Sequence, residues 1–377
     1  MSRARFAASS ITAACALAVA ACSGGNGNTS SGSFTGGTGG KSISSGTGGA
    51  GSGILFDAGS DGAGGSAGTG GAPPKYLIYA STDTDLFTLD PQDPALTLTH
   101  LGTFDCIGPS GTPNQQSTAM TDLAVDSNQN LWGLSSYGVR QLTVQGTTVH
   151  CGTKILVHVT DPHPTNPSFP FIKFEALTFA PKGVIKPGQE ILVAGDTAGE
   201  LWAIDTSSSP PSITQHGSFG TVPADDGRGH AYKYPGGLWE LSGDLVFLAN
   251  NDKPVGFATV RDCPNPPDNS GCNPIDTLME IDMTALAQAG TQSVKKGIRG
   301  QVVQRAACGG NGKYGFGSMY GIASWNDRVY GFSRSGNLVD ISNIDGTACL
   351  VSTYASDLFS GAAVTTLAPV LPPPPLK

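Results

Sequence analysis

Short apolar runs that end in small residues recur along the chain, at intervals of about fifty residues. The run LIYAS at residues 77–81 returns in related form at residues 131–135, 191–195, 245–249 and 329–333. A second run, LFTLD at residues 86–90, has related copies at residues 139–143, 201–205, 278–282 and 338–342. Turn residues separate the two runs in most copies, and this arrangement predicts a β-hairpin.

A third apolar run precedes the first in four copies, at residues 122–125, 175–179, 236–239 and 320–323. A fourth strand is predicted after the second run, for example at residues 212–216 and 301–304. Four antiparallel strands in each unit are typical of propeller blades. The layout resembles that of quinoprotein-like and WD-repeat-like propellers over residues 75–369, without their signature dipeptides. The resemblance implies an all-β fold, a β-propeller.

The first copy lacks its own third run and starts directly at Tyr76. The missing strand is expected at residues 362–368, where it would close the ring and remove exposed strand edges. We therefore expect five four-stranded blades, with the C-terminal strand closing blade one. The long interval between Leu238 and Ile322 leaves a sixth blade open. We interpret it as one blade with an insertion at residues 253–277, because each run occurs in it once.

The N-terminal residues have the pattern of a secretory signal. Arg3 and Arg5 precede a short apolar segment, which ends in the small residues 19–21 before Cys22. A basic start, an apolar core and a small-residue cleavage site predict export. The cysteine at the cleavage point resembles the lipobox of bacterial lipoproteins. That resemblance implies lipidation of Cys22, a membrane anchor, and a location in the cell envelope, at the outer membrane or the cell surface.

Residues 23–73 are almost entirely Gly, Ser, Thr, Ala and Asn. Such a segment buries too little apolar surface to offset its ordering entropy, so a flexible tether is predicted. Its average reach is roughly 40 Å. A Gly/Ser spacer after a lipobox resembles those of myxobacterial-type surface lipoproteins. The predicted organisation is a signal at 1–21, a lipidated tether at 22–74, a propeller at 75–370 and a Pro-rich tail at 371–377.

Composition narrows the function further. The net charge of -8 is spread thinly and no Lys/Arg cluster occurs, which argues against a nucleic-acid partner. No segment beyond the signal has the run of about 18 apolar residues that indicates a spanning helix. A monomer without cofactors is expected.

The cysteines agree with export. Of eight in the chain, Cys15 lies in the signal and Cys22 is the lipidation site, which leaves six. An even number in an exported chain predicts three disulfides, although 15 pairings are possible. The strand register favours Cys106–Cys151, Cys263–Cys272 and Cys308–Cys349. A metal site is the alternative, but the sequence has no C-x-x-C and no histidine at ligand spacing, so no metal is predicted.

No catalytic motif stands out. The chain has no Gly-x-Ser-x-Gly elbow, and its glycine-rich run at residues 309–313 lacks the Walker spacing. In propellers, function lies at the mouth where the inner strands begin. The residues expected at this mouth are Gln116, Asp122, Lys173, Glu175, Asp226, Arg228, His230, Tyr232, Lys313 and Tyr320. They suit a polar-ligand or glycan surface, or else an ordinary solvated mouth; none is assigned a catalytic role.

Three functions remain open. The first is a binding or scaffold module for a protein, a glycan or another envelope ligand. The second is an exported hydrolase, lyase or quinoprotein-like enzyme acting on a carbohydrate or small molecule. The third is a purely structural envelope protein. A concave mouth that gathers Asp122, Glu175, Arg228 and His230 within about 8 Å would favour the enzyme, and a flat or plugged mouth would favour binding.

Overall fold

The computed structural model describes residues 76–108, 117–135, 138–161, 170–251, 253–264, 271–309 and 314–375. Cys22, the predicted signal and the predicted tether lie outside these ranges, as do Gln116 and Lys313. Within them the fold is all-β and propeller-like, with four sheets. No helix in the described part of the chain is long and apolar enough to cross a bilayer.

One sheet contains two groups of strands, joined where β3 pairs in parallel with β7. The first group comprises β22 (Phe359–Ala363), β1 (Ile78–Thr82), β2 (Asp85–Leu89) and β3 (Leu98–Phe104). The second group comprises β4 (Asp122–Val125), β5 (Leu131–Ser135), β6 (Gly138–Gln145) and β7 (Thr148–Cys151), with β8 (Ile155–Leu156) paired to β6.

The other three sheets each contain one group. The third group comprises β9 (Phe174–Ala180), β10 (Ile191–Asp196), β11 (Glu200–Asp205) and β12 (Ser212–Ser218), and β16 (Gly290–Ser293) extends its sheet. The fourth comprises β13 (Trp239–Leu248), β14 (Val255–Asp262), β15 (Thr277–Ile281) and β17 (Lys295–Gln301), with the short helix α1 (Met283–Leu286). The fifth comprises β18 (Met319–Trp325), β19 (Arg328–Ser333), β20 (Asn337–Ser342) and β21 (Ala348–Thr353), preceded by a 3₁₀ turn (Ala306–Cys308).

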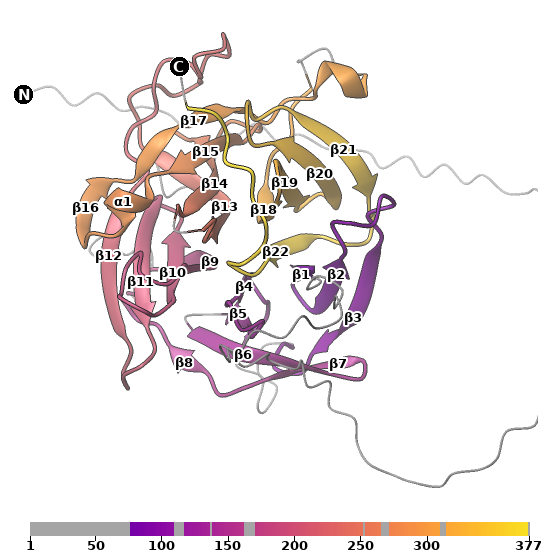
Figure 1. The fold of residues 1–377 in the computed structure, drawn as a ribbon, viewed down its shortest axis with the longest axis vertical. Helices are drawn as coiled ribbons and strands as arrows, with labels where there is room; N and C mark the ends of the chain where they lie inside the picture. Colours follow the sequence, from indigo (N-terminus) through magenta and orange to yellow (C-terminus); the bar gives the residue numbers. More distant parts are fainter. Residues whose placement is uncertain are drawn as a thin grey trace, which may run out of the picture. The chain divides into compact units, whose positions relative to one another are not determined.

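The first strand of each group lies toward a common centre (Figure 1). These inner strands are β22, β4, β9, β13 and β18. Each contacts the next in that order, and β18 also contacts β22. Apolar core clusters fill the spaces between neighbouring groups: one joins Phe104 with Leu123, another Leu134 with Leu192. The groups therefore pack face to face around the inner strands.

Strands covered on both faces lose the alternation that identifies a strand in the sequence. Every residue of β4, β13, β14, β15 and β22 is buried. The outer strand β3, in contrast, has an exposed His100 and Thr103 beside a buried Phe104. Patterns in the inner strands are therefore the hardest to interpret.

The fourth group shows this directly. Residues 245–249 are predicted to form a second strand, but residues 245–248 complete the inner strand β13. The second strand is β14 (Val255–Asp262), inside the interval 253–277 that the sequence assigns to an insertion. That interpretation is wrong for these residues, because β14 is buried on both faces and carries no alternating signal.

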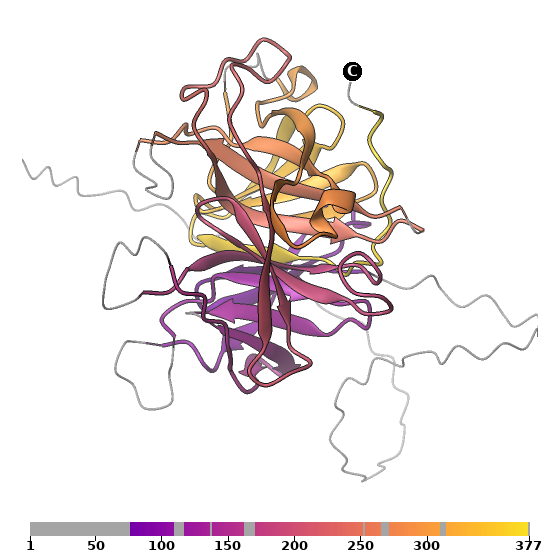
Figure 2. The same cartoon turned by 90° about the vertical axis from the view of Figure 1, so that its left-hand side faces the viewer.

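The C-terminal strand completes the first group. β22 pairs antiparallel with β1, with Tyr79 opposite Ala363 and Ala80 opposite Ala362. It begins before the predicted segment 362–368 and ends within it. The following residues leave the sheet, and the yellow C-terminal segment then runs along one side of the strands (Figure 2).

Three disulfides join Cys106 with Cys151, Cys263 with Cys272, and Cys308 with Cys349. Their Cα atoms lie 5.8, 4.1 and 5.8 Å apart. These are the pairs that the strand register favours. The first connects the first and second groups, and the third connects the segment after β17 with β21.

Candidate functional site

A small cavity lies where the inner strands begin, and we call it the upper cavity. Its volume is about 270 Å³. Residues at or near the start of each inner strand line it, together with turns between second and third strands. The charged lining residues are Asp83, Lys173, Glu175, Arg261 and Arg334. Side chains from all five groups therefore converge on one site.

The charged side chains at the rim of the upper cavity are paired with one another. Arg334 donates two hydrogen bonds to Asp83, at 2.6 and 2.8 Å. Lys173 Nζ lies 2.6 Å from Glu175 Oε1. The guanidinium carbon of Arg334 lies 5.9 Å from the ring centre of Tyr320, a cation–π contact. The rim thus presents cations and carboxylates in equal number.

A third ion pair lies deeper. Arg261 Nη2 donates to Glu240 Oε1 at 2.9 Å, and the Glu240 side chain is fully buried. Burial alone would lower the pKa of Arg261, but the negative charge of Glu240 outweighs it and raises that pKa. Next to this pair, Ser242 donates to buried Asp276 at 2.6 Å. A polar network therefore forms the floor of the cavity.

Two buried carboxyl groups lie below the upper cavity, on the inner strands. Asp122 on β4 accepts a hydrogen bond from the backbone amide of Leu177 on β9. Asp244 on β13 accepts one from the amide of Ile322 on β18, at 2.6 Å. Burial, reinforced by the nearby charge of Asp244, raises the pKa of Asp122 well above its ordinary value, and burial does the same for Asp244. Side chains thus link inner strands that share no sheet.

Glycines allow the inner strands to approach each other closely at this level. A Cβ atom at Gly243 of β13 would collide with the Cα atom of Tyr320 in β18. One at Gly361 of β22 would collide with Asp122 of β4. Together with the two carboxyl groups, these contacts fill the space between the inner strands. The upper cavity therefore has a floor and is a pit, not the opening of a channel.

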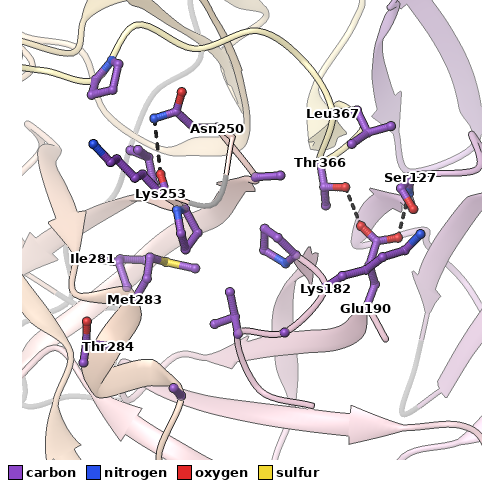
Figure 3. Close-up of a pocket in the computed structure, with 18 of the residues that line it drawn as sticks. Ser127, Lys182, Glu190, Asn250, Lys253, Ile281, Met283, Thr284, Thr366 and Leu367 are labelled. Atoms are coloured by element: carbon purple, nitrogen blue, oxygen red, sulfur yellow. Dashed lines mark hydrogen bonds between the residues drawn. The ribbon is translucent and has the colours of Figure 1, made fainter. Parts of the chain in front are cut away.

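A larger cavity of about 1250 Å³, the lower cavity, lies where the inner strands end. Figure 3 shows Glu190 between Ser127 and Thr366 there. Glu190 Oε2 accepts a hydrogen bond from the Ser127 amide at 2.7 Å, and Thr366 donates to Glu190 Oε1. Lys182 and Lys253 also line this cavity.

The C-terminal segment, residues 364–375, crosses the lower end by main-chain hydrogen bonds. Thr366 O accepts from the amide of Ala249, and Pro369 O accepts from the amide of Asn326, at 2.8 and 2.7 Å. Farther along, Arg299 donates to Pro374 O at 2.8 Å. Residues 371–375 of the predicted Pro-rich tail are thus attached to the folded domain.

The predicted mouth residues separate into two places. Lys173, Glu175 and Tyr320 line the upper cavity, and Asp122 lies buried beneath it. Asp226, Arg228, His230 and Tyr232 are not among the described residues that line it. The four side chains whose convergence would favour an enzyme, Asp122, Glu175, Arg228 and His230, therefore do not meet in this cavity.

Asp226 and His230 instead stabilise their own loop. Buried Asp226 accepts hydrogen bonds from the amides of Arg228 and His230 and from His230 Nδ1, at 2.8, 3.0 and 2.8 Å. Burial opposes ionisation of Asp226, but these bonds outweigh it and lower its pKa. Arg228 donates to Ile344 O, and Tyr232 packs edge to face on Trp239. The loop geometry accounts for all four side chains.

Sequence reasoning missed Asp83, Arg261 and Arg334. Asp83 lies in the β1–β2 turn and Arg334 in the β19–β20 turn. Because strands alternate in direction, the turn between second and third strands lies at the same end as the start of the inner strand. That rule could have identified both residues. Arg261 could not be found in this way, because β14 was not recognised as a strand.

Two clusters bring a carboxylate near two sulfur atoms. They are Asp105 with Cys106 and Cys151, and Glu240 with Cys263 and Cys272. In both, the sulfurs form a disulfide and offer no thiolate for a metal. Asp105 also accepts hydrogen bonds from His150 and the Cys151 amide, and Glu240 is paired with Arg261. Both carboxylates thus have structural partners.

No protein-family model and no curated protein matches the chain. Among solved structures, a proposed 6-phosphogluconolactonase from Bacteroides uniformis aligns with a TM-score of 0.36 and 12% identity, over 77% of this chain and 85% of that one. A protein from Lactobacillus plantarum aligns with a TM-score of 0.27 and 11% identity, over 74% of this chain and 66% of that one. At these TM-scores, neither similarity bears on what this chain does.

Proposed function

We propose that this protein is a lipid-anchored lipoprotein of the bacterial envelope whose five-bladed propeller binds an envelope ligand in the upper cavity. Each strand group would be one blade, and the pairing of β22 with β1 would close the ring. The contacts between successive inner strands support this count. Three disulfides are in keeping with an oxidising, extracytoplasmic compartment.

The observation that carries binding over catalysis is the pairing of charges in the upper cavity. Each charged residue that lines it has an opposite charge as a partner: Asp83 with Arg334, Lys173 with Glu175, and Arg261 with Glu240. A general acid or base needs a shifted pKa and a free proton position in reach of a substrate. Charged side chains that are already paired around a closed cavity suit the binding of a ligand better than general acid–base catalysis.

An exported enzyme is the second candidate, and one observation favours it. Buried Asp226 orients the partly exposed His230 through Nδ1, as a carboxylate orients a catalytic histidine. The same carboxylate, however, also caps two backbone amides of its loop. A structural role therefore explains the pair without a substrate.

The anchor and the binding role need separate tests. For the anchor, we expect the Cys22→Ser protein to leave the membrane fraction, and recovery in that fraction at the wild-type level would reject a lipid anchor. For the binding role, the full-length protein in detergent micelles is incubated separately with envelope glycans and envelope proteins. A ligand retained and recovered chemically unchanged supports binding. Turnover that depends on His230 and not on Glu175 would establish the enzyme instead.

A further inference from the structure

The upper cavity combines balanced charge with a high density of hydrogen-bonding groups. Its two exposed ion pairs and the deeper Arg261–Glu240 pair bring three cations and three carboxylates together. A ligand with a net charge would meet repulsion as well as attraction at this distance. The site therefore favours a ligand that is neutral and can both donate and accept hydrogen bonds.

Hydroxyl groups complete the lining. Thr121, Thr197, Ser242 and Ser360 border the cavity between the charged side chains. Three of these hydroxyls already donate within the protein: Thr121 to Leu134 O, Ser242 to Asp276 and Ser360 to Ser81 O, at 3.0, 2.6 and 3.3 Å. Their oxygens can still accept a hydrogen bond. A ligand hydroxyl, which donates once and accepts twice, can therefore bridge a carboxylate and a neighbouring cation or hydroxyl.

An aromatic face lies beside these groups. The half-buried Tyr320 supplies it, while Met120 and Leu241 border the same cavity as buried residues. The cavity volume of about 270 Å³ is slightly below the range of about 300–1,000 Å³ typical of sites for drug-sized ligands. A compact ring that is polar around its edge and has one face to stack on Tyr320 matches both the size and the lining.

We propose that the upper cavity binds the terminal residue of a neutral glycan, with Glu175 and Asp83 accepting from its hydroxyls and Arg334, Lys173 and Arg261 donating to them. The proposal rests on the binding function proposed above and names its ligand class. The closed floor implies recognition of a chain end, because a pit with no second opening does not allow a polysaccharide to pass through.

The test uses the full-length protein in detergent micelles and an array of defined glycans. The array presents termini of three kinds: neutral hexoses and N-acetylhexosamines, acidic uronic acids and sulfated sugars, and amine-bearing sugars. Immobilised envelope proteins form a separate arm. The variants are Glu175→Gln, which keeps the side-chain shape but removes one acceptor charge, and Lys182→Gln, a matched control in the lower cavity.

We expect the wild-type protein to bind neutral termini, with affinity nearly independent of salt because no net charge is neutralised. Glu175→Gln should weaken this binding about tenfold or more, since a hydrogen bond to a charged group is lost in a closed site. The same variant leaves the cavity with excess positive charge, so its relative binding of acidic termini should rise. Lys182→Gln should bind like the wild type.

Preference of the wild-type protein for acidic or amine-bearing termini would overturn the proposal, as would neutral binding that Glu175→Gln leaves unchanged. Failure to bind any glycan, with retention of an envelope protein that depends on Glu175, would reject the glycan and leave the binding function standing. Absence of binding in both arms would reject both.

Discussion

The two ends of the inner strands are held together by different interactions. At the upper end, side chains form ion pairs around the cavity, such as Arg334 with Asp83 and Arg261 with Glu240. At the lower end, main-chain hydrogen bonds from residues 364–375 attach the C-terminal segment to several strand turns. The contacts between strand groups therefore depend on side-chain charge at the upper end and on the C-terminal segment of the main chain at the lower end. Side chains can be exchanged without moving the backbone, so recognition is expected at the upper end and structural support at the lower one.

Removal of residues 364–377 should have the largest effect on this comparison. It removes the main-chain bonds of Thr366, Pro369 and Leu371 and exposes partners of the buried Val364 and Val370. We expect a loss on the order of 5 kcal/mol in the free energy of unfolding. Denaturant unfolding of the full-length and shortened chains measures it.

The control for this deletion is a chain shortened by residues 376–377 alone, which should unfold like the full-length protein. A chain lacking residues 364–377 with unaltered stability would show that the lower end needs no C-terminal segment. Because the deletion leaves the upper ion pairs in place, it tests chain continuity separately from charge.

Glu240→Gln should be the next largest change and addresses the upper end. Glu240 is fully buried, and the substitution removes the negative charge that faces the nearly buried Arg261 guanidinium. We expect a loss of about 3 kcal/mol in the free energy of unfolding. The matched control is Asp83→Asn, which breaks the more exposed pair with Arg334 and should cost about 0.5 kcal/mol. Equal losses of unfolding free energy in the two variants would mean that burial does not make the Arg261–Glu240 pair more important for stability than the Arg334–Asp83 pair.

The third prediction concerns the carboxyl pair between the two ends, whose effect should be smaller than the two losses above and depends on pH. Burial raises the folded-state pKa of Asp122 above its unfolded value. Its contribution to stability is therefore complete below about pH 4 and is lost as the pH rises through the folded pKa. Asparagine does not ionise, so Asp122→Asn should not show this loss at residue 122. Relative to the wild type, the free energy of unfolding of the variant should therefore rise by at least about 1 kcal/mol between pH 4 and pH 8. Denaturant midpoints across this range measure the difference.

A carboxyl group with the opposite shift provides the control. The hydrogen bond from Lys186 lowers the pKa of Asp205 to about 2, so its contribution is present above about pH 4 and is lost only in acid. Asp205→Asn should therefore leave the pH profile between pH 4 and pH 8 parallel to that of the wild type. A parallel profile for Asp122→Asn as well would show that Asp122 keeps an ordinary pKa in the folded protein.

Strands with one solvated face were the easiest to predict. The runs at residues 86–90 and 338–342 correspond to β2 and β20, with small shifts at their ends. β14 was missed because both of its faces are buried, and β13 was divided in two for the same reason. Polar residues in β13 added to the difficulty, since Glu240, Ser242 and Asp244 are buried with partners that the sequence does not reveal.

The candidate site was predicted in part. Lys173, Glu175 and Tyr320 could be placed because each lies at the start of an inner strand. Asp226 and His230 do not line the upper cavity, because their loop is long enough to fold on itself and satisfy its own polar groups. The predicted lipidation of Cys22 and the predicted tether remain predictions.

The sequence by itself determined the repeated antiparallel unit and the cysteine set whose pairs the strand register favours. These features are local, because a hairpin is specified by alternation and turn residues within a few positions. Only the tertiary structure decided which side chains meet at the two ends. Asp83 and Arg334 lie far apart in sequence, as do Asp122 and Leu177, and such contacts depend on how separate groups pack face to face. Packing of this kind leaves no periodic signal in the chain, so the charge balance of the upper cavity and the path of the C-terminal segment emerge only in the folded protein.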